Sequence, residues 1–172
     1  VVPGAAGALT AEDIDAASNI IIESSIFLTQ LEAPKDTVYY ALKIAKENNV
    51  TTILNPAPAS KIDENIFPLI DYFTPNEIEA SFYVNFKVEN EEDAKKASQQ
   101  LLKQGIKNVI ITLGDKGAFF ANNKENFHVK AMDLKEKVVD TTGAGDAFNG
   151  GLAVALTAVS YTHLTLPTNR EV

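Results

Sequence analysis

The residues best suited to chemistry lie between Asp140 and Phe148, where the sequence reads Asp-Thr-Thr-Gly-Ala-Gly-Asp-Ala-Phe. Two acidic residues flank a turn of small residues that leads into an apolar segment, a pattern typical of a loop that starts a helix. Because Gly143, Ala144 and Gly145 have little or no side chain, their backbone N–H groups can approach a ligand closely. The first N–H groups of a helix also carry partial positive charge. This stretch therefore predicts an anion site, best suited to phosphate.

Asp146 lies at the mouth of the same predicted site. A carboxylate there repels an anion, so its presence calls for a second role. We expect it to act on a nearby hydroxyl group by accepting its proton.

Short apolar segments alternate with stretches of helical spacing, which is the rhythm of βαβ units. We expect strands at 25–31, 50–54, 70–73, 108–113, 118–121 and 127–129, and helices at 36–49 and 91–104 and beginning at Thr10 and Thr74. The turn at 114–117 predicts a hairpin and an antiparallel margin. The fold class is therefore α/β, with a mostly parallel sheet and an antiparallel edge between helical layers.

Polar residues near the carboxyl ends of two predicted strands are further candidates, because ligands bind at this edge of open α/β sheets. Glu32 is either a substrate contact or a solvated loop carboxylate. Asn76 and Glu79 lie three positions apart and share a face of the predicted helix. Their oxygens either hold a hydrated Mg²⁺ or cap the helix.

Composition excludes several classes of protein. The chain of 172 residues has a formal net charge of −8, which argues against a basic surface for nucleic acid or anionic membranes. It has no cysteine, which excludes disulfides and thiolate metal sites. Purely apolar runs such as 20–22 are too short to cross a bilayer, and no basic signal-peptide region is present. We expect a cytoplasmic protein that binds small molecules.

Both ends of the chain depart from the pattern of a whole domain. The sequence opens with Val1 rather than methionine, and helical spacing is lost after Leu156. We expect residues 1–157 to form part of a domain and residues 158–172 to be an unrelated tail, similar to translated adapter read-through. His163 is therefore left out of the functional argument, and the fragment by itself is expected to be inactive.

Five segments together resemble a known family. Residues 140–152 are similar to the C-terminal motif of the ribokinase-like (PfkB) carbohydrate kinases, which lack a Walker A loop. The other four segments occur in the family's order: Gln30-Leu-Glu32, Asn55-Pro-Ala-Pro-Ala59, Thr74-Pro-Asn-Glu-Ile-Glu-Ala80 and Ile111-Thr-Leu-Gly-Asp-Lys-Gly117. The first two of these favour the ribokinase branch. A glycine motif alone is weak evidence, whereas ordered matches over residues 1–157 are strong.

The resemblance implies a three-layer ribokinase-like fold and ATP-dependent phosphoryl transfer to a primary sugar hydroxyl, with the 5-hydroxyl of D-ribose as the expected acceptor. It implies that Asp146 is the catalytic base and that Gly143, Ala144 and Gly145 form the anion hole. Glu32 matches a sugar contact of the family. A helix N-terminus and a base suit this reaction, because the protein mainly positions groups and neutralises charge.

The resemblance also implies cofactors and partners. Asn76 and Glu79 match a pair that organises Mg²⁺ and the phosphates, and Asp140 and Thr142 match part of a site for an activating K⁺. The complete protein is expected to be a homodimer. Nucleotide contacts are implied for Asn76, Gly145, Thr112, Leu113, Gly114, Asp115, Lys116 and Gly117.

Three alternatives remain at this point. The first is another kinase of the family, such as a fructokinase or an adenosine kinase. The second is a nucleotide-binding module without catalysis, or a truncated product. The third, a Rossmann-type dinucleotide site, is disfavoured because Gly143 and Gly145 lack the third spaced glycine of that motif.

Overall fold

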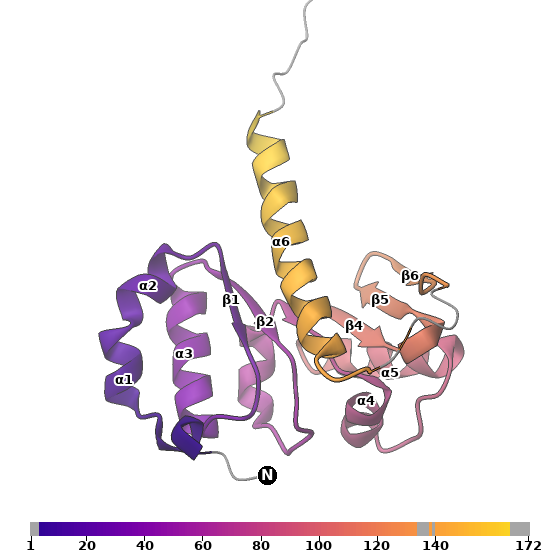
Figure 1. Ribbon diagram of the computed structural model, residues 1–172, viewed down its shortest axis with the longest axis horizontal. Helices are drawn as coiled ribbons and strands as arrows, with labels where there is room; N and C mark the ends of the chain where they lie inside the picture. Colours follow the sequence, from indigo (N-terminus) through magenta and orange to yellow (C-terminus); the bar gives the residue numbers. More distant parts are fainter. Residues whose placement is uncertain (1–3, 134–137, 139, 166–172) are drawn as a thin grey trace, which may run out of the picture.

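The computed structural model describes residues 4–133, 138 and 140–165, with side chains described as far as residue 158. At its centre is a six-stranded sheet whose strands lie side by side in sequence order (Figure 1). The first four strands are parallel, and the last two are antiparallel to their neighbours. The strands are β1 (Ile26–Thr29), β2 (Thr51–Leu54), β3 (Tyr72–Phe73), β4 (Asn108–Thr112), β5 (Ala118–Asn122) and β6 (Asn126–Val129). The predicted α/β class with an antiparallel edge is confirmed.

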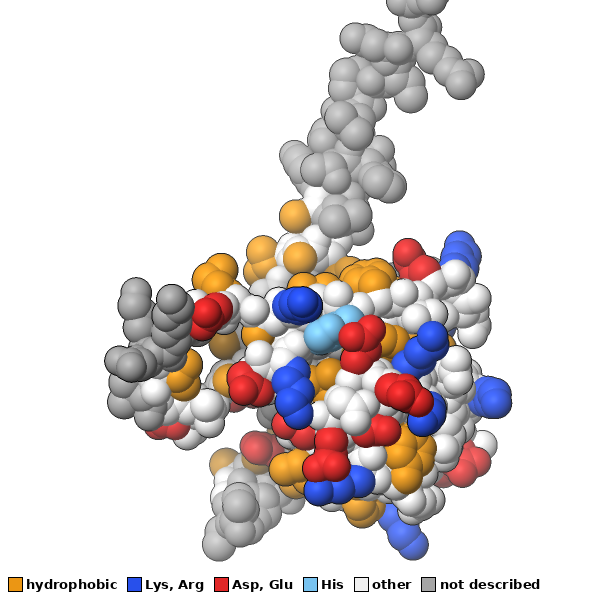
Figure 2. Space-filling view, turned by 90° about the vertical axis from the view of Figure 1, so that its right-hand side faces the viewer, with side chains coloured by type: hydrophobic (Ala, Val, Ile, Leu, Met, Phe, Trp, Pro, Cys, Tyr) orange, Lys and Arg blue, Asp and Glu red, His pale blue; other side chains and the backbone are white. Residues whose placement is uncertain are grey.

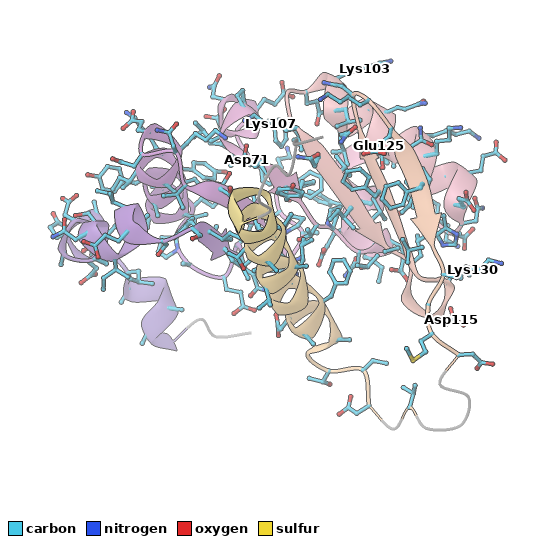
Figure 3. The ribbon with its side chains drawn as sticks, turned by 90° about the horizontal axis from the view of Figure 1, so that it is seen from above. Asp71, Lys103, Lys107, Asp115, Glu125 and Lys130 are labelled. Atoms are coloured by element: carbon cyan, nitrogen blue, oxygen red, sulfur yellow. The ribbon has the colours of Figure 1, made fainter. Side chains whose placement is uncertain are left out.

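Helices lie on both faces of this sheet. In Figures 1 and 3, α3 and α5 cover one face and α6 crosses the opposite face. The short helices α1 and α2 pack against α3, and α4 packs against α5. The α-helices are α1 (Ala11–Ala16), α2 (Ser18–Glu23), α3 (Lys35–Glu47), α4 (Glu77–Val84), α5 (Glu91–Lys103) and α6 (Ala144–Thr165); 3₁₀ segments are η1 (Gly4–Ala8), η2 (Glu64–Leu69) and η3 (Gly114–Lys116).

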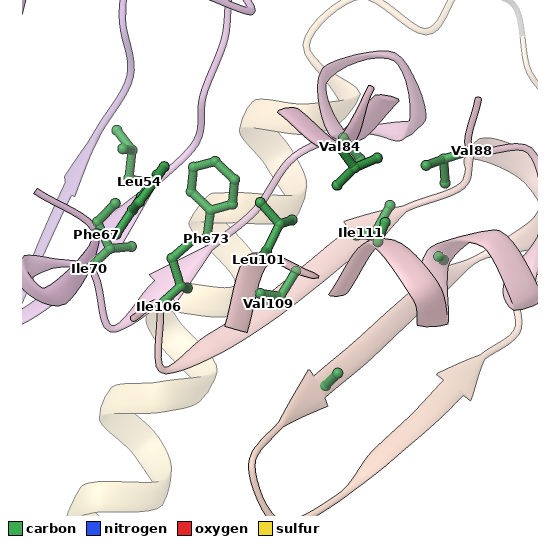
Figure 4. Close-up of a cluster of buried hydrophobic side chains, with 14 of the residues drawn as sticks. Leu54, Phe67, Ile70, Phe73, Val84, Val88, Leu101, Ile106, Val109 and Ile111 are labelled. Atoms are coloured by element: carbon green, nitrogen blue, oxygen red, sulfur yellow. The ribbon is translucent and has the colours of Figure 1, made fainter. Parts of the chain in front are cut away.

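The main hydrophobic core lies between the sheet and helices α3, α4 and α5 (Figure 4). Phe73 of β3 is fully buried there and meets the rings of Phe67 and Tyr83 edge to face, with centroids 6.4 and 5.4 Å away. Val109 and Ile111 of β4 belong to the same core, because alternate residues of a strand share a face. This packing gives the carboxyl edge of the sheet a rigid support.

Local sequence signals account for the start of the first helix but not for its length. Thr10 and Asp13 form the predicted capping box: the Asp13 carboxylate accepts from Thr10 N–H at 2.9 Å, and Thr10 Oγ1 accepts from Asp13 N–H at 3.4 Å. The helix is then interrupted at Ala17. There the Ser18 hydroxyl donates to the Asp15 carbonyl at 2.7 Å, a local bond of the kind that competes with regular helix.

Two other helix boundaries differ from the prediction. Pro75 precedes the N-cap of α4, which is Asn76, and so lies just outside the helix. Helix α6 continues to Thr165 rather than ending near Leu156. Residues 157–165 contain neither glycine nor proline, and the next helix breaker is Pro167. Residues 166–172 of the predicted tail lie outside the described residues.

Asp71, just before β3, links α3, β2 and the segment before β4 at the amino edge of the sheet. Its carboxylate pairs with Lys46 of α3 and with Lys107 at 2.8 Å, and it accepts from Thr52 N–H of β2 at 3.1 Å. Figure 3 shows Asp71 and Lys107 side by side. Burial by itself would raise the pKa of Asp71, but the two ammonium groups and the Thr52 N–H outweigh it and lower the pKa. The cluster therefore fixes the edge opposite to the predicted site.

On the face shown in Figure 2, acidic and basic side chains are interspersed and form no continuous basic patch. Over the described residues, none of the helices has both the length and the apolar character required to traverse a bilayer.

Candidate active site

The carboxyl ends of three adjacent parallel strands carry a row of polar residues. Gln30, Asn55 and Thr74 each stand first after β1, β2 and β3. The loops are tied together by backbone bonds from Leu31 N–H to Ala57 O at 2.9 Å and from Asn55 N–H to Thr29 O at 3.0 Å. The N-terminus of α6 meets this edge, so residues far apart in sequence converge there.

A cavity of about 330 Å³, here called the edge cavity, opens at this row. It brings Glu32 and Asp146 together with the predicted pair Asn76 and Glu79. Its lining also includes both glycines of the predicted anion hole: the residues are Gln30, Glu32, Asn55, Ala57, Thr74, Asn76, Glu79, Thr112, Gly143, Gly145, Asp146, Phe148 and Asn149.

Asp146 lies in the first turn of α6 and is exposed to the edge cavity. Its Oδ1 accepts a hydrogen bond from Gln30 Nε2 at 3.0 Å. Its Oδ2 lies 4.0 Å from the point that a Cβ on Gly143 would occupy, so this oxygen is next to the glycine turn. Glu32 is exposed and makes no hydrogen bond or ion pair within the described part of the chain. Both carboxylates are thus accessible to a ligand in the cavity.

The backbone at the start of α6 has the form of an anion site. Gly143 adopts a left-handed φ of 76°, a conformation that glycine tolerates best. Ala144 N–H donates to Thr141 O at 3.1 Å, whereas the N–H groups of Gly143, Gly145 and Asp146 find no acceptor among the described residues. Of the three predicted donors, Gly143 and Gly145 are therefore available and Ala144 is engaged.

A second cavity of about 560 Å³, here called the hairpin cavity, adjoins the first. The two share Asn76, Thr112, Gly145 and Phe148. The hairpin cavity is lined by Asn76, Glu77, Thr112, Gly114, Gly117, Ala118, Val129, Lys130, Ala131, Thr141, Ala144, Gly145 and Phe148. Two ligands, one in each cavity, would meet at the glycine turn.

The hairpin between β4 and β5 supplies half of the predicted nucleotide contacts from this segment. Thr112, Gly114 and Gly117 line the hairpin cavity. The side chain of Leu113 belongs instead to the buried core. Asp115 and Lys116 are exposed outside the cavity, and Lys116 Nζ donates to Glu89 O at 2.7 Å.

Gly117 closes this hairpin where no larger residue fits. Its φ is 103°, and an added Cβ would lie 2.0 Å from the carbonyl oxygen of Val129. The backbone just before β5 and the backbone at the end of β6 therefore approach each other more closely than a side chain permits.

Asn76 and Glu79 form a capping box at the start of α4. Burial raises the pKa of Glu79, and the Asn76 N–H partly opposes this effect. The described residues contain no group of three or more His, Cys, Asp or Glu that could hold a metal. Because both side chains already use oxygens within the cap, the pair suits a hydrated Mg²⁺ held through water, as that ion prefers, rather than direct ligation.

Asp140 and Thr142 form a turn just before the glycines. Asp140 Oδ1 accepts from Thr142 N–H at 2.8 Å. This bond lowers the pKa of Asp140, which favours an ionised carboxylate. Neither residue lines either cavity. Any cation held here would therefore affect a ligand in the cavities only indirectly, through the conformation of the turn that carries Gly143.

Comparison with known proteins identifies the family. The model of the pfkB family carbohydrate kinases matches residues 1–165. The chain belongs to this family. A ribokinase of Staphylococcus aureus is 40% identical over 153 residues, and a deoxyribokinase of Salmonella typhi is 35% identical over 154 residues. Each match covers 89% of this chain and 50% of the relative, so the chain spans about half the length of these proteins.

A solved structure of the family has the same fold. It is the Arabidopsis thaliana ribokinase complexed with ribose and ATP, which superposes with a TM-score of 0.78 at 30% identity. The match covers 83% of this chain and 46% of the Arabidopsis chain. The edge and hairpin cavities therefore lie in a chain with the fold of this family.

Sequence reasoning assigned no role to four residues that bond around Asp146 in this family member. They are Gln30, Asn55, Thr74 and Asn149. One available signal was that Asn55 and Thr74 each follow a predicted strand directly, whereas Gln30 lies inside the predicted strand 25–31 and follows only the observed, shorter β1. Another was that Asn149 is polar and stands one helical turn after Asp146, in an otherwise small and apolar segment.

Proposed function

We propose that the complete protein transfers the γ-phosphate of ATP to the 5-hydroxyl of D-ribose. The observation that carries the proposal is the junction of the two cavities at Gly145, beside an exposed Asp146. The ribokinase relatives support ribose as the acceptor and ATP as the donor.

In this proposal the edge cavity takes the sugar. Glu32 accepts hydrogen bonds from sugar hydroxyls, and Asp146 Oδ2 accepts the proton of the attacking hydroxyl. Proton acceptance by a positioned base contributes about 10²- to 10⁴-fold. The proton passes from the alcohol to Asp146 as the new O–P bond forms and the bond between the γ-phosphorus and the bridging oxygen of ATP breaks, which releases ADP, so no free alkoxide has to form.

The hairpin cavity takes the nucleotide, with Thr112, Gly114 and Gly117 along its wall. The free N–H groups of Gly143 and Gly145 then face the transferring phosphoryl group. These fixed donors stabilise the charge on its oxygens without reorganisation. Mg²⁺, when bound, would neutralise phosphate charge. The capping pair Asn76 and Glu79 would contact the water ligands of this ion rather than the ion itself.

We also propose that Asp140 and Thr142 form part of a K⁺ site, as the resemblance to the family implies. An ionised carboxylate and turn carbonyls suit a monovalent cation, and binding there would stiffen the turn that carries Gly143. In the complete protein, replacing K⁺ by tetramethylammonium is expected to lower turnover, and Asp140→Asn is expected to remove most of the difference between the two salts. Equal activity in both salts would contradict the K⁺ assignment.

The decisive test is the variant Asp146→Asn. It has to be made in the complete protein, because the chain spans only about half the length of its relatives. We expect turnover to fall by about 10²- to 10⁴-fold, while calorimetry shows nearly unchanged binding of ribose and ATP. Asp36→Asn is the matched control, since Asp36 is also an exposed acid in a first helical turn but lies in α3. Near-normal turnover of Asp146→Asn would refute the role of the base.

A second candidate acceptor is 2-deoxyribose, favoured by the identity with a deoxyribokinase. A panel of ribose, 2-deoxyribose, fructose and adenosine separates the candidates. The proposal expects the highest kcat/KM for ribose. A clear preference for any of the other three would reassign the substrate while leaving the reaction type in place.

A further inference from the structure

The carboxylate of Asp146 is held by a side chain that has no chemical role in the proposed reaction. Gln30 Nε2 donates to Asp146 Oδ1 at 3.0 Å and to Asn55 Oδ1 at 2.8 Å. A primary amide nitrogen has two hydrogens, so these two bonds use both of them. Gln30 therefore bridges the end of β2 and the first turn of α6.

The direction of these bonds is set from inside the protein. Asn55 is buried, and its Nδ2 donates to the carbonyl of Thr74 at 2.8 Å. That bond leaves Asn55 Oδ1 as the acceptor that faces Gln30. Gln30 must then present its nitrogen, because an oxygen in that position would face the oxygens of both Asn55 and Asp146.

The bonds from Asp146 through Gln30 and Asn55 to the Thr74 carbonyl form one arm of a hydrogen-bond network. A second arm runs from the Thr74 hydroxyl to the backbone at Gly145, the residue before Asp146. Thr74 Oγ1 donates to Asn149 Oδ1 at 2.7 Å, and Asn149 Nδ2 donates to the carbonyl of Gly145 at 2.9 Å. Thr74 and Asn149 are only 2% and 3% exposed. Their bonds are thus shielded from competing water. Together the two arms form a ring of hydrogen bonds that starts and ends at residues 145 and 146.

We propose that Gln30 is a positioning residue for Asp146. By holding Oδ1, it fixes the rotamer in which Oδ2 lies beside the glycine turn and faces the acceptor hydroxyl. The inference rests on the proposed function, because it needs Asp146 to be the base. Gln30 itself exchanges no proton with the substrate.

The main test is Gln30→Met in the complete protein, which keeps the length of the side chain but removes the donor. Misplacement of a reacting group by about 1 Å costs on the order of 100-fold in rate. We therefore expect kcat to fall by about 10- to 100-fold, with the KM for ribose changed less than kcat. ATP binding is expected to be unchanged, since Gln30 does not line the hairpin cavity.

Gln30→Glu is the second variant. It has the same shape but places an acceptor and a negative charge against Asp146, so its kcat is expected to fall at least as far. Gln100→Met, in α5 and half-buried, is the matched control and should retain normal kcat. Wild-type kcat in Gln30→Met would overturn the inference.

A double-mutant comparison separates positioning from general damage. If Gln30 acts only through Asp146, adding Gln30→Met to Asp146→Asn lowers the residual kcat no further. A further loss equal to that of the single variant would mean that Gln30 acts independently and would overturn the inference. Near-normal turnover of Asp146→Asn alone would instead refute the proposed base, so the two failures are distinguishable.

Discussion

Asn76 and Glu79 cap the same helix by binding each other reciprocally. Asn76 Oδ1 accepts from Glu79 N–H at 2.8 Å, and Glu79 Oε2 accepts from Asn76 N–H at 2.9 Å. Asn76 also lines both cavities, whereas Glu79 lines only the edge cavity. A structural cap and a candidate ligand contact are therefore the same pair of side chains, and the two roles have to be separated by experiment.

Asn76→Ala separates them. Loss of an N-cap costs about 0.5–2 kcal/mol of stability. Asn90, the N-cap of α5, lies outside both cavities and accepts from Asp93 N–H at 3.0 Å, so Asn90→Ala is the matched control. Chemical denaturation is expected to show similar losses for both variants. Only Asn76→Ala should lower kcat/KM for ATP, by about 10- to 100-fold; equal kinetics in the two variants would leave Asn76 a purely structural cap.

Gly117→Ala is expected to destabilise the hairpin strongly. A non-glycine residue in a disfavoured backbone conformation costs about 1–3 kcal/mol, and the clash with Val129 O adds to that. Gly151→Ala is the control, because nothing lies within 4 Å of an added Cβ in that helix position. There alanine should stabilise by about 0.5–1 kcal/mol. Urea titration of both variants measures the contrast, and a neutral Gly117→Ala would contradict the close approach.

Asp71→Asn should remove stability that depends on pH. The pKa of Asp71 is lower in the folded chain than in the unfolded chain, so its contribution is present above about pH 4 and is lost as the pH falls through the folded pKa. At pH 7 we expect a loss of about 1.5–3 kcal/mol, the range for hydrogen bonds to charged groups. Denaturation at pH 7 and pH 3 tests this, since the difference from wild type must shrink at the lower pH.

Glu79→Gln should show the opposite dependence on pH. Burial raises the pKa of Glu79, so its contribution is fully present below about pH 4.3 and declines as the pH rises through the folded pKa. Relative to Glu79→Gln, the wild type is therefore expected to be more stable at pH 4 than at pH 7. Glutamine can still accept from Asn76 N–H, so the cap is kept. A constant difference across this range would rule out the raised pKa.

The spacing of apolar and capping residues predicted most of the helices and strands, because these elements depend mainly on interactions between residues close in sequence. The short apolar run at 108–113 indicated a buried strand, and the spacing of Thr10 and Asp13 indicated a capping box; both are present. The break at Ala17 was not predictable from the apolar spacing, because it coincides with a single bond from the Ser18 hydroxyl to a backbone carbonyl. One side-chain bond of this kind leaves no periodic trace.

The candidate site also contains residues that a local motif indicates and contacts that depend on tertiary packing. The glycine turn and Asp146 were visible as a local motif, and strand ends indicated Glu32 and Asn76. The bond from Gln30 to Asp146 was not predictable, since it depends on how β1 and α6 meet across the sheet. The contiguous motif at 112–117 also includes Leu113, whose side chain belongs to the buried core, whereas Thr112, Gly114 and Gly117 line the hairpin cavity.

The bond between Gln30 and Asp146 spans 116 positions of the chain. Closing so long a loop costs entropy that the strand pairings in between must first offset, so we expect this contact to form late in folding. In reverse, we expect the first turn of α6 to detach while the sheet persists, because residues 144–147 are all exposed. On warming we therefore expect the Asp146 carboxylate to lose its alignment before the sheet melts. Under the proposed function, turnover of the complete protein is then expected to be lost before its secondary structure.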